Sequence, residues 1–293
     1  MSKKRDMPTL DSRLLTKYNL NGPRYTSYPT ALEFHTDISE QDLIEAVATS
    51  ERQELALYLH IPFCHSLCYY CGCNKIVTRH RDKADEYLDF LLKEIENKAR
   101  YFDTYRVSQL HLGGGTPSFL TQAQFNRLVK ALKSHFVFED DAEMGIEIDP
   151  REVELDLLDR LRALGFNRLS FGLQDTNLEV QQAINRVQDT EFVAELMTRG
   201  RALGFSSINL DVIYGLPHQT AERFARTLED VLALNPDRVS LFSYAHLPAR
   251  FAAQKKIKDE WLPNGEAKLA LMLAAIETFT SRGYVAIGMD HFA

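Results

Sequence analysis

His60-Ile-Pro-Phe-Cys-His-Ser-Leu-Cys-Tyr-Tyr-Cys-Gly-Cys-Asn74 holds every cysteine of this 293-residue chain. The four are Cys64, Cys68, Cys71 and Cys73, in the spacing C-x3-C-x2-C-x-C. A chain that places all of its sulfhydryl groups in one short segment has the pattern of a metal or cofactor site. We therefore expect this loop to hold a cofactor.

The spacing of the cysteines narrows the choice of cofactor. A structural zinc site usually takes its four ligands from two separated hooks, because the tetrahedral ion must be closed on every side. Three cysteines at this short spacing can instead ligate three irons of one cubane cluster. The fourth iron then lacks a protein thiolate and is open to a small molecule. A zinc site, disulfides and chance clustering remain as alternatives.

Two further observations connect the loop to a family. C-x3-C-x2-C resembles the signature of the radical S-adenosylmethionine (SAM) enzymes. The context Tyr69-Tyr-Cys-Gly-Cys-Asn74, together with Tyr18-Asn-Leu-Asn-Gly-Pro-Arg-Tyr-Thr-Ser-Tyr-Pro-Thr30, is similar to one branch, the oxygen-independent coproporphyrinogen III oxidases of haem synthesis. The similarity extends from about Leu14 to Ala293. Related haem chaperones share the cluster motif and are an alternative, but those that resemble this family usually lack the fourth cysteine.

The resemblance implies a reaction and its cofactors. Cys64, Cys68 and Cys71 would ligate a [4Fe-4S] cluster, and two SAM molecules would bind beside it. The implied reaction is the radical oxidative decarboxylation of two propionates of coproporphyrinogen III, which yields protoporphyrinogen IX without oxygen. A low-potential donor such as flavodoxin or ferredoxin would supply electrons. The positions that match SAM contacts in the family are Tyr58, Tyr70, Gly114, Gly115, Thr116, Glu147, Gln174, Arg186, Asp211 and Ala245.

Two residues are candidates for contact with the substrate. By spacing, Cys73 could be a cluster ligand, but the superfamily pattern needs only three cysteines, so we assign it to the substrate side of the site. Arg24 lies within the N-terminal signature and is our candidate partner for a propionate. Both assignments name side chains that would act on the substrate rather than on the cofactors.

From residue 55 onward, apolar strand-like runs alternate with amphipathic helical stretches, which indicates parallel strands joined by crossovers. Each unit consists of one strand and the helix that follows it. The six predicted units average about forty residues each, whereas a unit of a complete eight-unit barrel takes about 31, and this count favours an incomplete, laterally open (β/α)6 barrel. The radical SAM resemblance implies the same α/β core. The predicted strands are 55–63, 107–112, 144–148, 168–173, 207–213 and 238–243, and the first helix carries an apolar stripe of Leu88, Leu91, Leu92, Ile95, Ala99 and Phe102.

We divide the chain into a short N-terminal extension (1–50), a barrel core (51–283) and the start of a truncated C-terminal region (284–293). Within the core, Arg162-Ala-Leu-Gly-Phe166 returns as Arg201-Ala-Leu-Gly-Phe205, and both copies are predicted to join a helix to a strand. Their glycines stand where a helix C-terminus favours a left-handed residue. The residues 284–293 themselves predict a strand that begins another unit. Members of the family that the chain resembles carry a further domain after such a segment, so we expect the chain to be truncated.

In parallel α/β folds, ligands collect at the carboxyl ends of the strands. Gly113-Gly-Gly-Thr-Pro-Ser118 follows the second predicted strand, and its missing β-carbons would let backbone groups approach a ligand. Glu147, Gln174 and Asp211 are polar residues among apolar strand neighbours, so they should face a ligand or a partner. Arg186 could bind a carboxylate in bidentate fashion. A purely structural role remains an alternative for each of these residues.

The composition sets limits on the partners. The chain is 45% hydrophobic and carries 34 Lys and Arg against 41 Asp and Glu, a net charge of −7. This balance disfavours nucleic acid, and a polyanionic substrate would need a local basic pocket. The apolar run 269–276 is too short to span a membrane and is interpreted as a buried helix face. Residues 1–6 are not followed by an apolar signal segment, so we expect a cytosolic protein. We also expect it to be a monomer.

Overall fold

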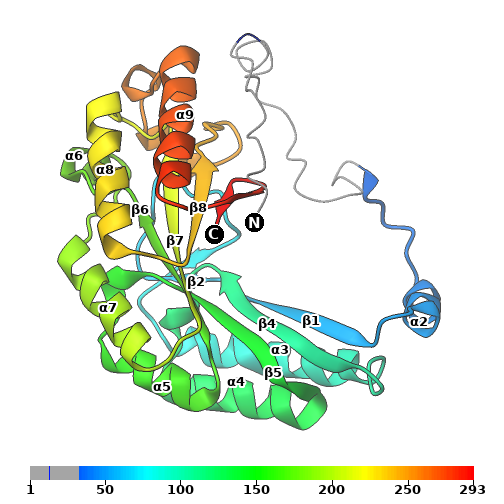
Figure 1. Cartoon of the computed structure of the whole chain (residues 1–293). Helices are drawn as coiled ribbons and strands as arrows, with labels where there is room; N and C mark the ends of the chain where they lie inside the picture. Colours follow the sequence, from blue (N-terminus) through cyan, green and yellow to red (C-terminus); the bar gives the residue numbers. More distant parts are fainter. Residues whose placement is uncertain (1–12, 14–32) are drawn as a thin grey trace, which may run out of the picture.

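The fold is built on one curved, mostly parallel sheet. A computed structural model describes residue 13 and residues 33–293, and within them the main sheet has eight strands in the order β1-β4-β5-β6-β7-β8-β10-β9. Neighbours from β1 to β8 pair in parallel. The edges β1 and β9 do not pair with each other, so the barrel is open (Figure 1). The parallel strands are β1 Glu54–Ile61, β4 Arg106–Gly114, β5 Val137–Ile148, β6 Arg168–Gln174, β7 Ser207–Tyr214 and β8 Arg238–Ser243.

Helices cover the outer side of this sheet (Figure 1). The predicted apolar stripe of the first helix is confirmed, because Leu88, Leu91, Ile95 and Ala99 are buried on one side of α3. The predicted buried helix at 269–276 is α9. Among the described residues no helix is long and apolar enough to cross a membrane. The helices are α2 Glu40–Thr49, α3 Lys83–Ala99, α4 Gln122–His135, α5 Asp156–Leu164, α6 Leu178–Ala183, α7 Thr190–Ala202, α8 Ala221–Leu234 and α9 Gly265–Ser281.

Alternate residues of each strand point to opposite faces of the sheet. The outward set is apolar and packs under the helices, where it forms the hydrophobic core. Ten of these side chains, two from each of β4 to β8, are at most 5% exposed: Leu110, Leu112, Ile146, Ile148, Leu169, Phe171, Ile208, Leu210, Val239 and Leu241. The inward set is mostly polar and lines the hollow of the barrel. The open barrel predicted from the order of elements is therefore confirmed.

Two predicted strand boundaries were wrong for local reasons. The first strand ends at Ile61, because Pro62 has no N–H to donate, and a short strand β2, Phe63–Cys64, follows. The third strand starts at Val137 rather than at 144. Its first half is acidic and largely solvated, so it lacks the apolar run by which buried strands are predicted, and its pairing with β4 is irregular.

The C-terminal segment does not begin another parallel unit. Residues 284–293 form a hairpin of β9 Ala286–Gly288 and β10 His291–Phe292, and β10 pairs antiparallel with β8. Gly288, Met289 and Asp290 all have positive φ, and this left-handed turn reverses the chain at once. Phe292 is buried beside Phe279 of α9. The prediction of a strand that begins another unit was therefore wrong, because the segment adds an antiparallel hairpin to the sheet instead.

The repeated pentapeptide does mark two equivalent junctions. Gly165 follows α5 with φ 106°, and Gly204 follows α7 with φ 76°. Both glycines are in the left-handed region that a residue with a β-carbon rarely adopts. Phe166 and Phe205 then enter the core, so each copy turns a helix back toward the next strand.

Candidate cofactor site

The cysteine loop leaves the carboxyl end of β1 and is closed by a second pair of strands. Cys64 lies in β2, which pairs in parallel with β3, Ile76–Val77. All four cysteines are free thiols, so the disulfide alternative is not realised. Cys68 is buried, Cys64 and Cys71 are half-buried, and Cys73 is exposed. The loop thus presents three partly enclosed thiols and one at the surface.

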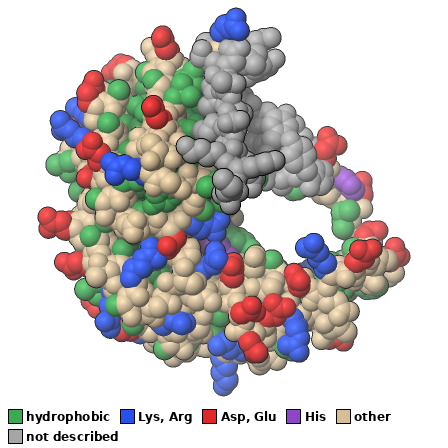
Figure 2. All heavy atoms as spheres, in the orientation of Figure 1, with side chains coloured by type: hydrophobic (Ala, Val, Ile, Leu, Met, Phe, Trp, Pro, Cys, Tyr) green, Lys and Arg blue, Asp and Glu red, His purple; other side chains and the backbone are tan. Residues whose placement is uncertain are grey.

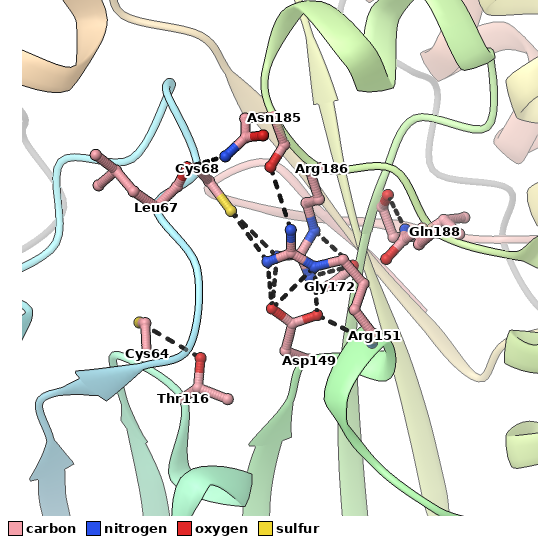
Figure 3. Close-up of polar contacts among 11 residues, drawn as sticks. Cys64, Leu67, Cys68, Thr116, Asp149, Arg151, Gly172, Asn185, Arg186 and Gln188 are labelled. Carbon is pink, nitrogen blue, oxygen red and sulfur yellow. Dashed lines mark hydrogen bonds and ion pairs between the residues drawn. The ribbon is translucent and has the colours of Figure 1, made fainter. Parts of the chain in front are cut away.

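The loop is held in place by neighbouring segments. The Tyr69 N–H donates to the Ile184 carbonyl at 2.9 Å, and the Asn185 amide donates to the Leu67 carbonyl at 2.8 Å (Figure 3). On the other side Gln254, only 1% exposed, donates to the carbonyls of Tyr70 and Ala245 at 2.9 and 3.1 Å. Two predicted cofactor-binding positions that are far apart in sequence are therefore fixed by one buried side chain.

Two arginines converge on Cys68, Arg151 from the turn that follows β5 and Arg186 from the segment that follows α6 (Figure 3). Arg151 Nη2 lies 3.3 Å and Arg186 Nη1 3.5 Å from the Cys68 Sγ. Both arginines also bind the Asp149 carboxylate, at 2.6 and 3.1 Å. Burial by itself would raise the pKa of Asp149, but the two guanidinium groups outweigh it and hold that pKa well below its usual range. Two positive charges and one negative charge therefore leave an excess of positive charge facing the sulfur.

Cys71 and Cys73 interact with each other. The Cys73 N–H donates to the Cys71 Sγ at 3.4 Å. The Cys73 thiol also interacts with the Cys71 sulfur, and this interaction, helped by Lys75, lowers the pKa of Cys71 to about 6. The same interaction between the two side chains, together with burial of its sulfur, raises the pKa of Cys73. The thiolate is the form that binds metals. Cys71 is thus suited to be a ligand, and Cys73 to remain protonated beside it.

The glycine turn after β4 packs on the protein's own chain. A β-carbon on Gly114 would lie 2.5 Å from the His60 Nδ1, and one on Gly115 would lie 2.7 Å from the Pro62 carbonyl carbon. Close packing of β4 against the start of the cysteine loop therefore explains these glycines without any ligand. Thr116, next in sequence, places its Oγ1 3.5 Å from the Cys64 Sγ. The turn and the cysteine loop form one unit.

The inner face of the sheet encloses a cavity of about 320 Å³ that Glu147 and Asp211 both line. Figure 2 shows acidic, basic and histidine side chains together in the hollow of the molecule. The Glu147 Oε1 lies 3.2 Å from the His111 Nε2, and its Oε2 accepts from the Gly114 N–H at 3.3 Å. Burial and the Glu147 carboxylate raise the pKa of Asp211 to about 6. Tyr58 stacks on His111 near the same carboxylate.

Gln174 ends β6 in a strained position. Its φ is 67°, its side chain is 7% exposed, and its buried Oε1 has no hydrogen-bond partner among the described residues. An unsatisfied buried oxygen costs free energy of the order of 1–3 kcal/mol. A ligand that donates a hydrogen bond would remove this cost, in keeping with the predicted role.

The predicted site residues thus fall into two neighbouring groups. Cys64, Cys68, Thr116 and Arg186 lie around the cysteine loop, and Glu147 and Asp211 lie in the cavity. Arg24 lies outside the described residues. Sequence reasoning missed Asp149 and Arg151, although both directly follow a predicted strand and the carboxyl-end rule would have found them. It also missed the inward residues Arg168, Asn209 and Arg238, which only their alternation with apolar neighbours could have indicated.

Comparison with known proteins agrees with this geometry. Residues 58–231 match the family model described as the radical SAM superfamily. The chain belongs to the radical SAM superfamily. It is 59% identical over 283 residues to an oxygen-independent coproporphyrinogen III oxidase from Escherichia coli strain K12, and 48% identical over 288 residues to one from Pseudomonas aeruginosa. Each alignment covers 97% of this chain, which spans 62% and 63% of those relatives.

A solved radical SAM structure is similar over the same extent. Coproporphyrinogen III oxidase from Escherichia coli matches with a TM-score of 0.91 and 57% identity, covering 97% of this chain and 64% of that one. The high score over nearly the whole described chain agrees with the open barrel of parallel strands. This chain therefore corresponds to about two thirds of that protein's length.

Membership of the radical SAM superfamily implies a [4Fe-4S] cluster and SAM, and the loop fits such a cluster. Three free thiols lie on one loop, and positive charge faces the most buried of them. In the described part of the chain, no three His, Cys, Asp or Glu side chains are grouped as ligands of one metal ion. A cubane needs no such convergence, because each thiolate binds a different iron.

Proposed function

We propose that this chain carries the catalytic core of an oxygen-independent coproporphyrinogen III oxidase. In this reaction two propionate side chains of coproporphyrinogen III each lose carbon dioxide, a hydrogen atom and one electron, and become vinyl groups. The observation that carries the proposal is the 59% identity over 97% of the chain, with the three-cysteine loop intact. The bound cofactors would supply reductive cleavage of SAM and abstraction of the hydrogen atom.

The chain's residues would position and shield this chemistry. Cys64, Cys68 and Cys71 would hold the cluster, and Arg151 and Arg186 would stabilise negative charge at its Cys68 corner. The remaining predicted positions would hold two SAM molecules: Tyr58, Tyr70, Gly114, Gly115, Thr116, Glu147, Gln174, Arg186, Asp211 and Ala245. Gln174 would use its free oxygen for this purpose.

Two residues would act on the substrate side. Cys73 is exposed as a residue, but its sulfur is partly enclosed beside Cys71. The hydrogen bond with Cys71 and this partial enclosure raise the pKa of the Cys73 thiol, so it would remain protonated near neutral pH. That state suits a donor of a proton or hydrogen bond rather than an iron ligand. Arg24 would bind a propionate. The electron donor would be a low-potential protein such as flavodoxin or ferredoxin, and we propose that the chain acts as a cytosolic monomer.

The test is turnover by anaerobically reconstituted protein. 5′-Deoxyadenosine and carbon dioxide are measured with and without coproporphyrinogen III, for this chain and for a version extended to the length of its relatives. We expect both products to depend on the substrate in at least the extended protein. If neither version forms them in a substrate-dependent way, the proposal is rejected. Stable stoichiometric haem binding without turnover would favour a haem chaperone instead.

A further inference from the structure

The cavity continues beyond Glu147 and Asp211 to the first residues of β6 and β8. Arg168 begins β6 and Arg238 begins β8, and both line the cavity. Between them lies β7, whose Ser207 pairs with Arg168 and whose Asn209 pairs with Arg238. At a strand spacing of about 4.8 Å, the Cα atoms of the two arginines lie roughly 10–12 Å apart. Two long side chains that flank two short ones can reach one ligand group between them.

Most polar side chains deeper in the cavity satisfy each other. The Asn209 amide donates to the Ser170 Oγ at 2.9 Å and to the Asp211 Oδ1 at 2.8 Å, and its carbonyl oxygen accepts from the Ser240 hydroxyl at 3.1 Å. The Glu147 carboxylate is paired with His111. These groups therefore do not require a ligand to offset their desolvation.

The two arginines at this end of the cavity keep unused donors. Arg168 binds Glu143 through Nη2 at 2.5 Å, but its buried Nε has no acceptor among the described residues. The backbone of Arg238 belongs to the β7–β8 ladder, but its side chain forms no hydrogen bond or ion pair with any other residue that the structure describes. Glu143 balances one of the two positive charges, so with respect to residues 33–293 this end of the cavity keeps one unpaired guanidinium and an unused N–H.

We propose that Arg168 and Arg238 form a binding site for a carboxylate group of the ligand that enters the cavity. A guanidinium presents a planar fork of donors that matches a carboxylate in geometry and charge. A carboxylate that enters the cavity loses its hydrogen bonds to water. The Arg238 guanidinium and the Arg168 Nε–H can replace these hydrogen bonds and balance the negative charge. The site lies on the inner face of β6 to β8, away from the cysteine loop.

The carboxylate could come from the methionyl end of SAM or from a propionate, and the register favours a propionate. Glu147, Ser170, Asn209 and Arg238 form one continuous row across four strands, which puts the Cα atoms of Glu147 and Arg238 up to about 14 Å apart. A ligand that reaches both ends of the row must be wide. This assignment rests on the proposed function, because coproporphyrinogen III carries propionates beyond the one that reacts at a given time.

The test measures binding without turnover. The probe is coproporphyrin III, the oxidised form, which keeps the four propionates but is not the substrate, and it is titrated by fluorescence into anaerobically reconstituted protein. Arg238→Gln is compared with Arg238→Lys, which keeps the charge, and with Arg226→Gln, which changes an exposed arginine of α8. SAM binding is measured on the same samples, and thermal unfolding checks that each variant is folded.

We expect Arg238→Gln to weaken porphyrin binding at least about ten-fold, as for the loss of a charge-assisted hydrogen bond. Arg238→Lys should lose less, Arg226→Gln should match the wild type, and SAM affinity should not change. Equal affinities for porphyrin and for SAM in Arg238→Gln and Arg226→Gln would overturn the site, as would a wild type that binds no porphyrin. Loss of SAM binding alone would overturn the propionate assignment. Porphyrin binding that depends on Arg238 without turnover would reject the proposed function and leave this site standing.

Discussion

The two faces of the sheet use the same strands for opposite purposes. On the outer face, Phe171 and Leu210 are fully buried under helices. On the inner face, their sequence neighbours Ser170, Asn209 and Asp211 line a cavity and bind one another through polar atoms. Since successive residues alternate between faces, every strand contributes to both. The outer face stabilises the fold, and the inner face can therefore hold groups that are costly to bury.

The cysteine loop should show the largest difference between neighbouring residues. We expect Cys71→Ser to abolish assembly of the cluster, because a serine hydroxyl is a poor substitute for a thiolate ligand. Cys73→Ser should still assemble it but should lose turnover. Iron and labile sulfide after anaerobic reconstitution measure the first effect, and 5′-deoxyadenosine formation measures the second. Equal loss of iron in both variants would contradict the separation of a ligand from a substrate-side residue.

The outer face should dominate stability. Phe171→Ala should lower the free energy of unfolding by about 3–5 kcal/mol, because it removes a fully buried ring and leaves a cavity. Ser170→Ala, one residue earlier on the inner face, should cost less than about 1.5 kcal/mol, since it removes one net hydrogen bond. Denaturant unfolding of the two variants measures the difference. Similar losses would mean that the inner network stabilises the fold as much as the core does.

The positive charge beside Cys68 should tune the bound cluster. Arg151→Gln removes a cation that donates to this sulfur, so the reduced, more negative cluster is stabilised less. We expect the reduction potential to fall by tens of millivolts. This is on the order of the Coulomb energy between the cluster and a cation that Asp149 partly neutralises, at an effective dielectric constant of about 20. A redox titration followed by electron paramagnetic resonance measures the shift.

The matched control is Arg160→Gln, which breaks an exposed ion pair with Asp156 on α5 and should leave the potential unchanged. A rise in the potential of Arg151→Gln, or the same change in both variants, would show that the guanidinium does not act on the cluster through its charge.

The smallest expected effect is a pH dependence that originates on the inner face. Burial, with the Glu147 carboxylate, raises the pKa of Asp211 to about 6, so folding favours its protonated form. This contribution to stability is complete below the unfolded pKa near 4 and is lost as the pH rises through about 6. We expect Asp211→Asn to be more stable than the wild type at pH 7, by about 1–2 kcal/mol because Asp211 is only half-buried.

Denaturant unfolding of both proteins from pH 4 to pH 8, without SAM, measures this difference. The advantage of Asp211→Asn should vanish toward pH 4. An advantage that grows as the pH falls would have the wrong sign and would show that Asp211 is stabilised in its charged form.

Sequence patterns predicted much of the site because several of its parts are local. The cysteine spacing, the glycine turn and the polar strand ends at Glu147 and Gln174 all stand beside apolar runs that predict strands. The C-terminal hairpin was not predictable in this way. Its chain reversal depends on left-handed backbone at Met289 and Asp290, and neither residue is a glycine that would have indicated such a turn. Gly114 and Gly115 were predicted to contact SAM, which stays a prediction, and the close contacts that the structure shows are with His60 and Pro62.

The amino-acid sequence by itself determined the order of strands and helices, the outer core and the identity of the cluster loop, because periodicity and cysteine spacing are properties of short segments. Only the tertiary structure decided which charges meet. Arg151 and Arg186, both bound to Asp149, converge on Cys68, and Arg168 and Arg238 lack full partners among the described residues. Such contacts join segments that are far apart in the sequence, and their distances depend on the curvature and register of the sheet that carries these segments, which no local pattern specifies.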